Sequence, residues 1–158
     1  MIFSRNSVRG VMVAALVFMG SAASAQIDAT NPDAIMKAMQ KYGFVATLEK
    51  DNQGDPKIVS RVSRTKFRVY FFGCKENLNC ASIHFRAGYD LKNPISALVV
   101  NEWNRNKRFT KAYIDDEGDP FLEMDVNMAF DGTGEQNFQD TLDWWRVMVE
   151  NFEEFIDW

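Results

Sequence analysis

The sequence KFRVYFFG (66–73) is followed by the loop CKENLNC (74–80) and by ASIHFRA (81–87). Apolar and polar residues alternate on both sides of the loop, which is typical of two half-buried strands joined as a hairpin. If Cys74 lies opposite Cys80, the pairing of every other position follows. In that register the apolar pairs are Phe71 with Ile83, Val69 with Phe85, and Phe67 with Ala87. One face of the hairpin is then continuously apolar, so the cysteine spacing and the hydrophobic pattern predict the same register.

Cys74 and Cys80 are the only two cysteines of the chain. A redox pair usually has a C-x-x-C spacing beside a helix N-terminus, and this pair has neither feature. A zinc site needs two further ligands, and the chain contains a single histidine, His84. The spacing therefore favours a structural disulfide, and we expect neither a metal nor a cofactor.

Residues 1–25 have the features of a secretory signal peptide. Arg5 and Arg9 form a positively charged start, and a short apolar run extends from Val11 to Met19. Ala23-Ser24-Ala25 matches the small-x-small pattern that precedes a signal peptidase site. We expect cleavage near Ala25 and a periplasmic or secreted protein, in an oxidising location where a disulfide forms. The apolar run is about half as long as a membrane-spanning helix, so we expect no membrane association after cleavage.

Removal of the leader leaves residues 26–158 with a net charge of −6, because the leader holds two of the 18 basic residues and none of the 22 acidic ones. A nucleic-acid-binding domain needs a basic face for the phosphates, so we expect no nucleic-acid partner. The remaining chain is long enough for one domain with its own core. We therefore divide the chain into a signal peptide, 1–25, and a single domain, 26–158.

Capping and turn residues predict the elements on either side of the hairpin. Asn31 and Pro32 are typical of a helix start, and Gly43 of its end. Asn93-Pro94 predicts a second helix in the same way, with Ile95, Leu98, Val99 and Trp103 as its apolar stripe. We expect further strands at 44–50, 57–63, 109–114 and 121–126, joined in pairs by acidic turns at 51–56 and 115–120.

A third helix is expected from about Gly134 to the end of the chain, with Thr133 and Gln136 as a capping box. The expected fold class is therefore α+β. An antiparallel sheet of about six strands has three helices on one face, in the order α-β-β-β-β-α-β-β-α.

The last helix has an unusually wide apolar surface. Its main seam consists of residues spaced alternately four and three apart: Phe138, Leu142, Trp145, Val149, Phe152 and Ile156. Trp144, Met148 and Phe155 form a second stripe beside that seam. A helix that packs on one sheet needs a narrower apolar arc than the two stripes make together. We therefore name Trp144, Met148 and Phe155 as a candidate surface for a protein partner or for self-association as a homodimer. The alternative is that another helix of the same chain covers the second stripe.

The hairpin register places four polar residues on the face opposite the apolar set: Arg68, Tyr70, His84 and Arg86. Arg68 faces Arg86, and Tyr70 faces His84. These four residues form a candidate anion patch on an otherwise acidic protein. The alternative interpretation is a solvated outer face whose arginines pair with nearby carboxylates.

The acidic turn at 115–120 offers oxygen ligands for calcium, but its spacing differs from that of an EF-hand loop. Asp-x-x-Gly-Asp is also a common pattern for a hairpin turn with a positive-φ glycine, and we interpret it as a turn. The chain has no G-x-S-x-G, H-E-x-x-H, phosphate-loop or dinucleotide-binding motif. We therefore assign no catalytic residues.

Several motifs resemble those of the YbjN-like family. They are Gly73-Cys74 with Cys80; Phe85-Arg86-Ala87-Gly88-Tyr89; Asn101-x-Trp103-Asn104 with Arg108-Phe109; Tyr113-x-Asp115-x-Glu117-Gly118-Asp119-Pro120; and Leu122-Glu123-Met124-Asp125. The resemblance covers roughly Asn31 to Asp157. It implies a candidate regulator of bacterial sensory transduction, with a fold similar to that of type III secretion chaperones and with relatives that bind other proteins. The family has no established catalytic residues, so the resemblance assigns none to this chain.

These observations predict an exported, non-enzymatic domain with a protein-binding or regulatory, chaperone-like role. Two alternatives remain open. One is a hydrolase that uses carboxylates without a familiar motif. The other is a small-anion or metal-binding module that uses the Arg68 and Arg86 face or the acidic turn.

Overall fold

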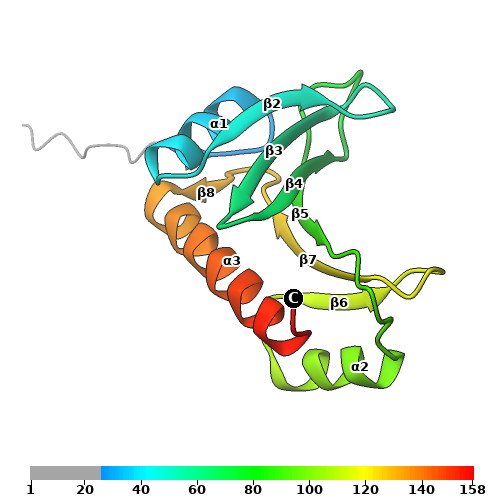
Figure 1. Cartoon of the computed structure of the whole chain (residues 1–158). Coiled ribbons are helices and arrows are strands. Elements are labelled where there is room, and N and C mark those ends of the chain that lie inside the picture. The colour runs from blue at the N-terminus through cyan, green and yellow to red at the C-terminus, as the bar shows by residue number, and fades with distance from the viewer. Residues whose placement is uncertain (1–25) are drawn as a thin grey trace, which may run out of the picture.

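In a computed structural model of the chain, residues 26–158 are described (Figure 1). The predicted leader and its cleavage site after Ala25 lie outside these residues. The elements, in chain order, are β1 (Gln26–Ile27), α1 (Pro32–Lys41), β2 (Ala46–Lys50), β3 (Pro56–Val62), β4 (Thr65–Phe72), β5 (Ser82–Gly88), α2 (Ala97–Asn106), β6 (Lys111–Ile114), β7 (Pro120–Asn127), β8 (Thr133–Gly134) and α3 (Glu135–Phe155). No helix among residues 26–158 combines the length and the apolar character needed to cross a bilayer.

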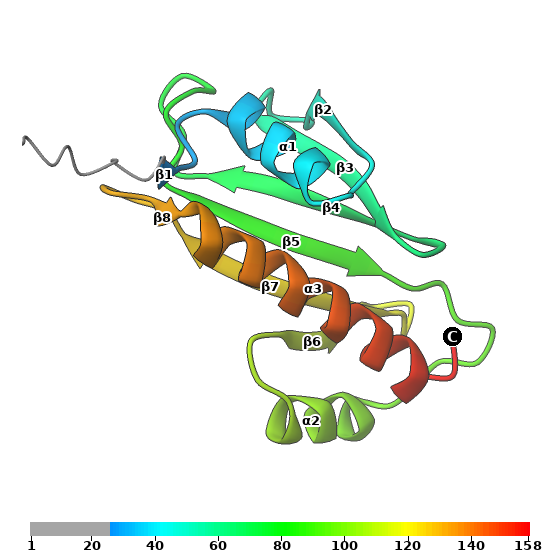
Figure 2. The same ribbon diagram turned by 90° about the vertical axis from the view of Figure 1, so that its left-hand side faces the viewer.

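Six strands form one antiparallel sheet in the order β2-β3-β4-β5-β7-β6. The predicted hairpin register is confirmed, because Phe71 pairs with Ile83, Val69 with Phe85, and Phe67 with Ala87. The α+β class and the order of helices and strands in the main sheet are also confirmed. Helices α1 and α3 lie on one face of the sheet, whereas α2 lies beside β6 at its edge (Figures 1 and 2). Within residues 26–158, no helix lies on the opposite face of the sheet.

The core lies between the sheet and α3. All six residues of the predicted seam are buried: Phe138, Leu142, Trp145, Val149, Phe152 and Ile156. The Trp145 ring contacts the hairpin directly, with ring centroids 5.5 Å from Phe67 and 5.4 Å from Phe85. Contacts of this type contribute beyond the area that they bury. The apolar face of the hairpin and the seam of α3 therefore form one continuous core.

The predicted start and end of α1 are confirmed. The Asn31 side chain accepts a hydrogen bond from the backbone N–H of Ala34 at 3.1 Å, and Pro32 is the first helical residue. Gly43 follows the helix with φ +86°, a conformation that glycine adopts without steric cost. Ile35 and Met39 are buried on the sheet side of the helix.

The two acidic turns have the same hydrogen bonds. The Asp51 carboxylate accepts from the N–H groups of Gln53 and Asp55, at 2.9 and 3.0 Å. The Asp115 carboxylate accepts from Glu117 and Asp119 at 3.0 and 2.9 Å. In each turn the first aspartate is thus occupied by backbone donors, as the turn interpretation predicts.

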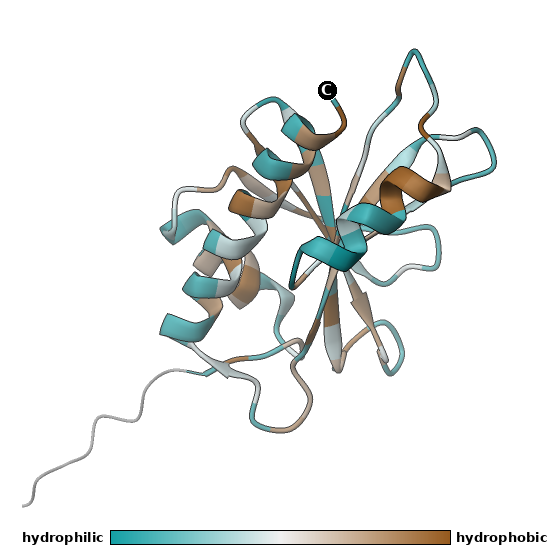
Figure 3. Cartoon of the chain, turned by 90° about the horizontal axis from the view of Figure 1, so that it is seen from below, coloured by the Kyte–Doolittle hydropathy of each residue, from teal (hydrophilic) through white to brown (hydrophobic). Residues whose placement is uncertain are grey.

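Helix α2 differs from the prediction at its start and on its surface. It begins at Ala97, after the N-cap residue Ser96. The preceding segment is a loop, in which Leu91 donates its N–H to the Asp119 carboxylate at 3.1 Å. The buried residues of α2 are Val100 and Trp103, whereas Leu98 is 81% exposed. The hydrophobic residues gather in the first half of the helix (Figure 3). Assignment of Leu98 to the buried stripe was therefore wrong.

The predicted capping box at the start of α3 does not form. Gly134 is the N-cap residue, and no side chain caps the helix. Thr133 instead pairs with Ile27, and Gly134 with Gln26, in a separate two-stranded sheet of β1 and β8. This small sheet, which the sequence did not reveal, joins the first described residues to the start of α3.

Candidate functional site

The second stripe of α3 is only partly exposed. Met148 is 5% exposed, so it contributes to the core and not to a bare surface, which corrects that part of the predicted stripe. Phe155 is partly buried against α2, with its ring centroid 5.5 Å from that of Trp103. Trp144 remains 39% exposed. Helix α2 and the loop that follows it therefore cover much of the stripe, as the alternative interpretation predicted.

Trp144 has an aromatic neighbour that the sequence did not single out. The ring centroids of Trp144 and Phe109 are 4.7 Å apart, with an angle of 35° between the ring planes. Both rings are exposed. Exposed apolar patches on soluble proteins often mark interaction surfaces, and aromatic residues are enriched in protein interfaces.

The backbone at Phe109 holds its ring in this position. Phe109 has φ +69°, and the N–H of Thr110 donates to the carbonyl of Arg108 at 2.8 Å. A hydrogen bond between residues two apart, around a residue with positive φ, forms the rarer and more strained type of γ-turn. Such a conformation costs about 1–3 kcal/mol for a residue other than glycine. The backbone is therefore strained at Phe109, the residue whose ring contacts Trp144.

Charges of opposite sign adjoin this aromatic pair. The segment before Phe109 contains Arg105, Lys107 and Arg108, all exposed, and the Arg108 guanidinium lies 4.9 Å from the centre of the Phe109 ring. On α3, exposed Asp140 and Asp143 precede Trp144. The aromatic pair therefore lies between a basic segment, which precedes Phe109, and an acidic turn of α3, which precedes Trp144.

The open face of the sheet contains a network of charged side chains around the buried residues His84 and Glu123. His84 from β5 lies between two carboxylates of β7, with Nδ1 2.6 Å from Asp125 Oδ1 and Nε2 3.3 Å from Glu123 Oε1. Glu123 is 6% exposed and also accepts a hydrogen bond from the Tyr113 hydroxyl at 2.9 Å. Lys111 Nζ lies 3.3 Å from Glu123 Oε2 and 3.2 Å from Asp125 Oδ2.

The network shifts the pKa values of its outer members. Burial, with the hydrogen bond to Glu123, raises the pKa of Tyr113 to about 12. Burial alone would raise the pKa of Asp125, but the hydrogen bonds from His84 and Lys111 outweigh it and lower that pKa below 3.8. The hydrogen bond to Asp125 raises the pKa of Lys111, although desolvation opposes the shift. These shifts favour the charged forms of Asp125 and Lys111 and the neutral form of Tyr113.

The four residues of the candidate anion patch share this face. Arg68 pairs with Arg86, and Tyr70 with His84, as the register predicted. However, Arg86 Nε lies 3.3 Å from Glu123 Oε1. The carboxylates of β7 therefore already neutralise much of the positive charge of the candidate anion patch. The hairpin pattern could not identify Glu123, Asp125 and Lys111, because β7 and β6 follow β5 in the sheet but are not its neighbours in the chain.

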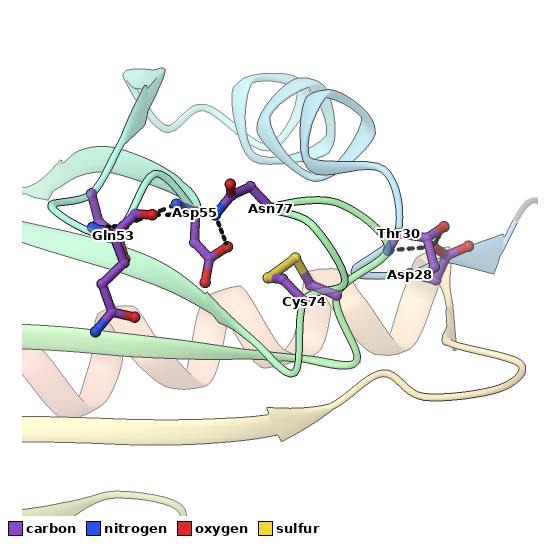
Figure 4. Close-up of a disulfide and its surroundings, with 8 residues drawn as sticks. Asp28, Thr30, Gln53, Asp55, Cys74 and Asn77 are labelled. Carbon is purple, nitrogen blue, oxygen red and sulfur yellow. Dashed lines mark hydrogen bonds between the residues drawn. A yellow bond between two sulfur atoms is a disulfide. The ribbon is translucent and has the colours of Figure 1, made fainter.

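The predicted disulfide between Cys74 and Cys80 is present. The loop that it closes forms a small hairpin of its own, in which the N–H of Leu78 donates to the carbonyl of Lys75 at 3.0 Å. The Asn77 amide then donates to the Asp55 carboxylate at 2.8 Å and to the Gln53 carbonyl at 3.3 Å (Figure 4). The loop is therefore tied to the turn between β2 and β3.

Within residues 26–158 no group of three His, Cys, Asp or Glu side chains is placed to hold a metal ion. The hollow beside His84 has a volume of about 420 Å³ and is lined in part by Tyr70, Phe72 and Glu123. The histidine that lines this hollow, His84, already contacts the carboxylates of Glu123 and Asp125.

Comparison with known proteins identifies the family. No curated protein matches the chain at a significant level. A family model described as "YbjN: Putative bacterial sensory transduction regulator" matches residues 31–158, which include every element of the main sheet and all three helices. The chain therefore belongs to the YbjN family.

Proposed function

We propose that this protein is an exported, non-enzymatic regulatory domain that acts by binding other protein chains, in a chaperone-like manner. The family description of a sensory transduction regulator supports a regulatory role. The exposed contact between Trp144 and Phe109, presented by a strained turn, is the observation on which the binding role depends.

Export is supported by the signal-peptide pattern of residues 1–25 and by the disulfide. Disulfides persist in oxidising compartments and are rare in the cytosol. N-terminal sequencing of the protein, purified from cells that express the full-length chain, tests this part of the proposal. We expect a mature N-terminus at Gln26, and retention of Met1 in the disulfide-bonded protein would contradict export by cleavage.

A catalytic role receives less support from the charged face. A general acid needs a carboxyl group whose pKa is raised, whereas the pKa of Asp125 is lowered. Glu123 is already contacted by His84, Arg86, Lys111 and Tyr113, which leaves little of its capacity for a substrate. The same contacts argue against the anion-binding alternative.

The partner that we assign to the Trp144 and Phe109 surface is a second copy of this chain. Two-fold association places the same patch on both subunits, so a patch with basic and acidic sides can be complementary to itself. The basic segment of Arg105, Lys107 and Arg108 would then face Asp140 and Asp143 of the other copy. Aromatic residues and arginine are enriched in such contacts.

Sedimentation equilibrium of the exported protein tests this surface directly. We expect a monomer–dimer equilibrium that weakens in high salt and shifts to monomer by about tenfold or more for Trp144→Ala, because a central aromatic residue often carries over 1 kcal/mol of binding. Leu98→Ala is the matched control, since Leu98 is an exposed apolar residue elsewhere on the molecule. A strictly monomeric protein, or a dimer unaffected by Trp144→Ala, would overturn the assignment of this surface.

A further inference from the structure

The two edge strands of the main sheet, β6 and β2, differ in how their outward backbone groups are hydrogen-bonded. At the β6 edge, the Asn104 side chain donates to the carbonyl of Ala112 at 2.9 Å and accepts from its N–H at 2.8 Å. The amide thus takes the place of a neighbouring strand, and α2 packs beside it. An edge strand covered in this way cannot pair with another chain.

The β2 edge lacks such a cover over its second half. The Gln40 side chain donates to the carbonyl of Ala46 at 2.9 Å, so the backbone groups of Ala46 point away from β3. Because orientation alternates along an antiparallel strand, the N–H and C=O of Leu48 and Lys50 point the same way. Within residues 26–158, no hydrogen-bond partner occupies the outward groups of Leu48.

An open groove of about 710 Å³ lies along this part of β2. Its walls come from four parts of the chain: the start of α1, the residues Leu48–Lys50, the turn that leads from β2 into β3, and the tip of the disulfide loop. Leu48 and Leu78 are both exposed there. The groove therefore combines free main-chain groups with apolar side chains, which is the combination that binds an extended peptide.

The disulfide loop is fixed in the position that forms one wall. Glu76 and Asn77 have φ +52° and +62°, values typical of the tight turn of a two-residue hairpin. The Asn77 amide anchors this turn to Asp55 and Gln53, as Figure 4 shows. Leu78 is therefore held beside the β2 edge and does not fold back into the core.

The charges at the groove indicate the character of the peptide. Three carboxylates, of Asp33, Glu49 and Glu76, line it together with one ammonium group, that of Lys50. Asp33 and Glu49 are each paired with a lysine, but Glu76 makes no ion pair with another residue of the described chain. A basic residue beside the apolar part of a ligand would complement Glu76.

We propose that this groove, defined by Leu48, Glu76 and Leu78, binds an extended peptide that adds a strand to β2. The peptide presents apolar side chains at alternate positions, which contact Leu48 and Leu78, and a lysine or arginine toward Glu76. Its main chain pairs with the outward N–H and C=O of Leu48. The groove shares no residue with the Trp144 and Phe109 surface, so this site stands apart from the proposed dimer.

Selection from a display library of random ten-residue peptides, against the exported protein in its oxidised form, tests the site. We expect the selected peptides to alternate apolar residues with others and to carry at least one lysine or arginine. Labelled copies of the best peptide are then titrated against variants. Leu48→Pro removes the outward N–H together with the leucine side chain, at an edge position where proline is tolerated, and we expect affinity to fall about tenfold.

Three further variants separate the contributions. Leu48→Ala keeps the N–H and should weaken binding less than Leu48→Pro, whereas Glu76→Lys should weaken binding of basic peptides and not of peptides with their lysines replaced by glutamine. Leu98→Ala, which alters an exposed leucine outside the groove, should have no effect. Thermal unfolding of each variant checks that it is folded.

Several results would overturn the proposal: no selected binder, peptides without the alternating pattern, or full affinity for a folded Leu48→Pro variant. Loss of peptide binding in Trp144→Ala with retention in Leu48→Pro would assign the peptides to the other surface. The dimer is tested by sedimentation of Trp144→Ala, and the peptide site by titration of the Leu48 variants. Either proposal can therefore fail without affecting the test of the other.

Discussion

Glu123 is the residue at which the open face of the sheet is most constrained. It is a buried carboxylate on a face without a helix, and its oxygens contact side chains from β5 and β6. Removal of one partner from a buried ion pair is costly because it leaves an uncompensated charge. The charged groups around Glu123 therefore form one structural unit, and Asp125 at its exposed side is the member whose titration can be followed.

Asp125→Asn tests the contribution of this unit to stability. The pKa of Asp125 is lowered below 3.8 in the folded protein, so its carboxylate stabilises the fold above that pH and the contribution is lost as the pH falls through the folded-state pKa. The side chain is 61% exposed, so screening by water keeps the gain below about 1 kcal/mol. We expect the variant to unfold at a lower denaturant concentration than the wild type at neutral pH.

The difference between Asp125→Asn and the wild type should disappear in acid, where both side chains are uncharged. Urea unfolding at a series of pH values measures it. Asp131→Asn is the control, because Asp131 is exposed and has no hydrogen bond or ion pair to another described residue. An Asp125→Asn deficit that persists unchanged in acid would mean that the carboxylate acts through its shape and not through its charge.

These charged residues show what a sequence can and cannot reveal at this scale. The pairing of His84 with Tyr70 follows from the hairpin, since a single short loop fixes which residues are opposite. The pairing of His84 with Asp125 depends on β7 lying next to β5, and α2 and β6 separate the two in the chain. Local patterning carries no information about that order, so the carboxylates that neutralise the patch could not be assigned.

Among the elements, the pairing of α2 with β6 depends most on one side chain. Asn104 makes two hydrogen bonds to the backbone of Ala112, and Ala112 is buried. Asn104→Ala leaves both backbone groups without that partner at the edge of the sheet. We expect a loss of about 1–3 kcal/mol from the free energy of unfolding, since each bond contributes about 0.5–1.5 kcal/mol.

Asn101→Ala supplies the comparison for Asn104→Ala. Asn101 is exposed on the same helix and makes no hydrogen bond through its side chain to another residue within 26–158. Urea unfolding should show little change for Asn101→Ala. The exposed edge in Asn104→Ala should also increase aggregation on concentration, which light scattering records. Equal stability of the two variants would show that α2 covers β6 without help from Asn104.

The predicted boundaries succeeded where local chemistry acts alone. Asn31 and Pro32 begin α1, because the cap needs only the N–H of Ala34 three residues later. Asn93 and Pro94 have the same residue types, but contacts with the turn between β6 and β7 hold that segment, including a bond from Leu91 to Asp119. The start of α3 likewise depends on pairing of β8 with β1, more than a hundred residues earlier. Tertiary contacts therefore decided the start of α2, which was predicted wrongly, and the α3 capping box, which does not form.

On the scale of the whole molecule, the sheet separates two surfaces with different roles. Helices α1 and α3 cover one face, which supplies the core (Figure 2). The other face carries the charged network around Glu123. The strained turn at Phe109 and the groove along β2 lie at opposite edges of the sheet order. If both proposals hold, the domain would bind an extended peptide and a second copy of the chain at the same time, at opposite edges of the sheet.

The disulfide connects the stability of the molecule to its location. Cys74 and Cys80 close a short loop, and a crosslink of this length stabilises a fold by about 2 kcal/mol in the chain-entropy model. For a domain of this size, we expect Cys74→Ser with Cys80→Ser to lower the Tm by about 5–10 °C. The β4–β5 register should persist, because the apolar pairs that specify it lie outside the loop.

Hydrogen exchange followed by mass spectrometry separates these two effects. Amides of residues 74–80 should exchange faster in the double serine variant, and with them those of the β2–β3 turn to which Asn77 is bonded. Amides of β4 and β5 should keep their protection at a temperature well below the Tm. Reduction of the wild type with a phosphine should reproduce the same pattern, which makes it the matched control. Uniformly faster exchange throughout the sheet would instead show that the crosslink, and not the hydrophobic pattern, maintains the hairpin, and the protein would then depend on an oxidising compartment in order to fold.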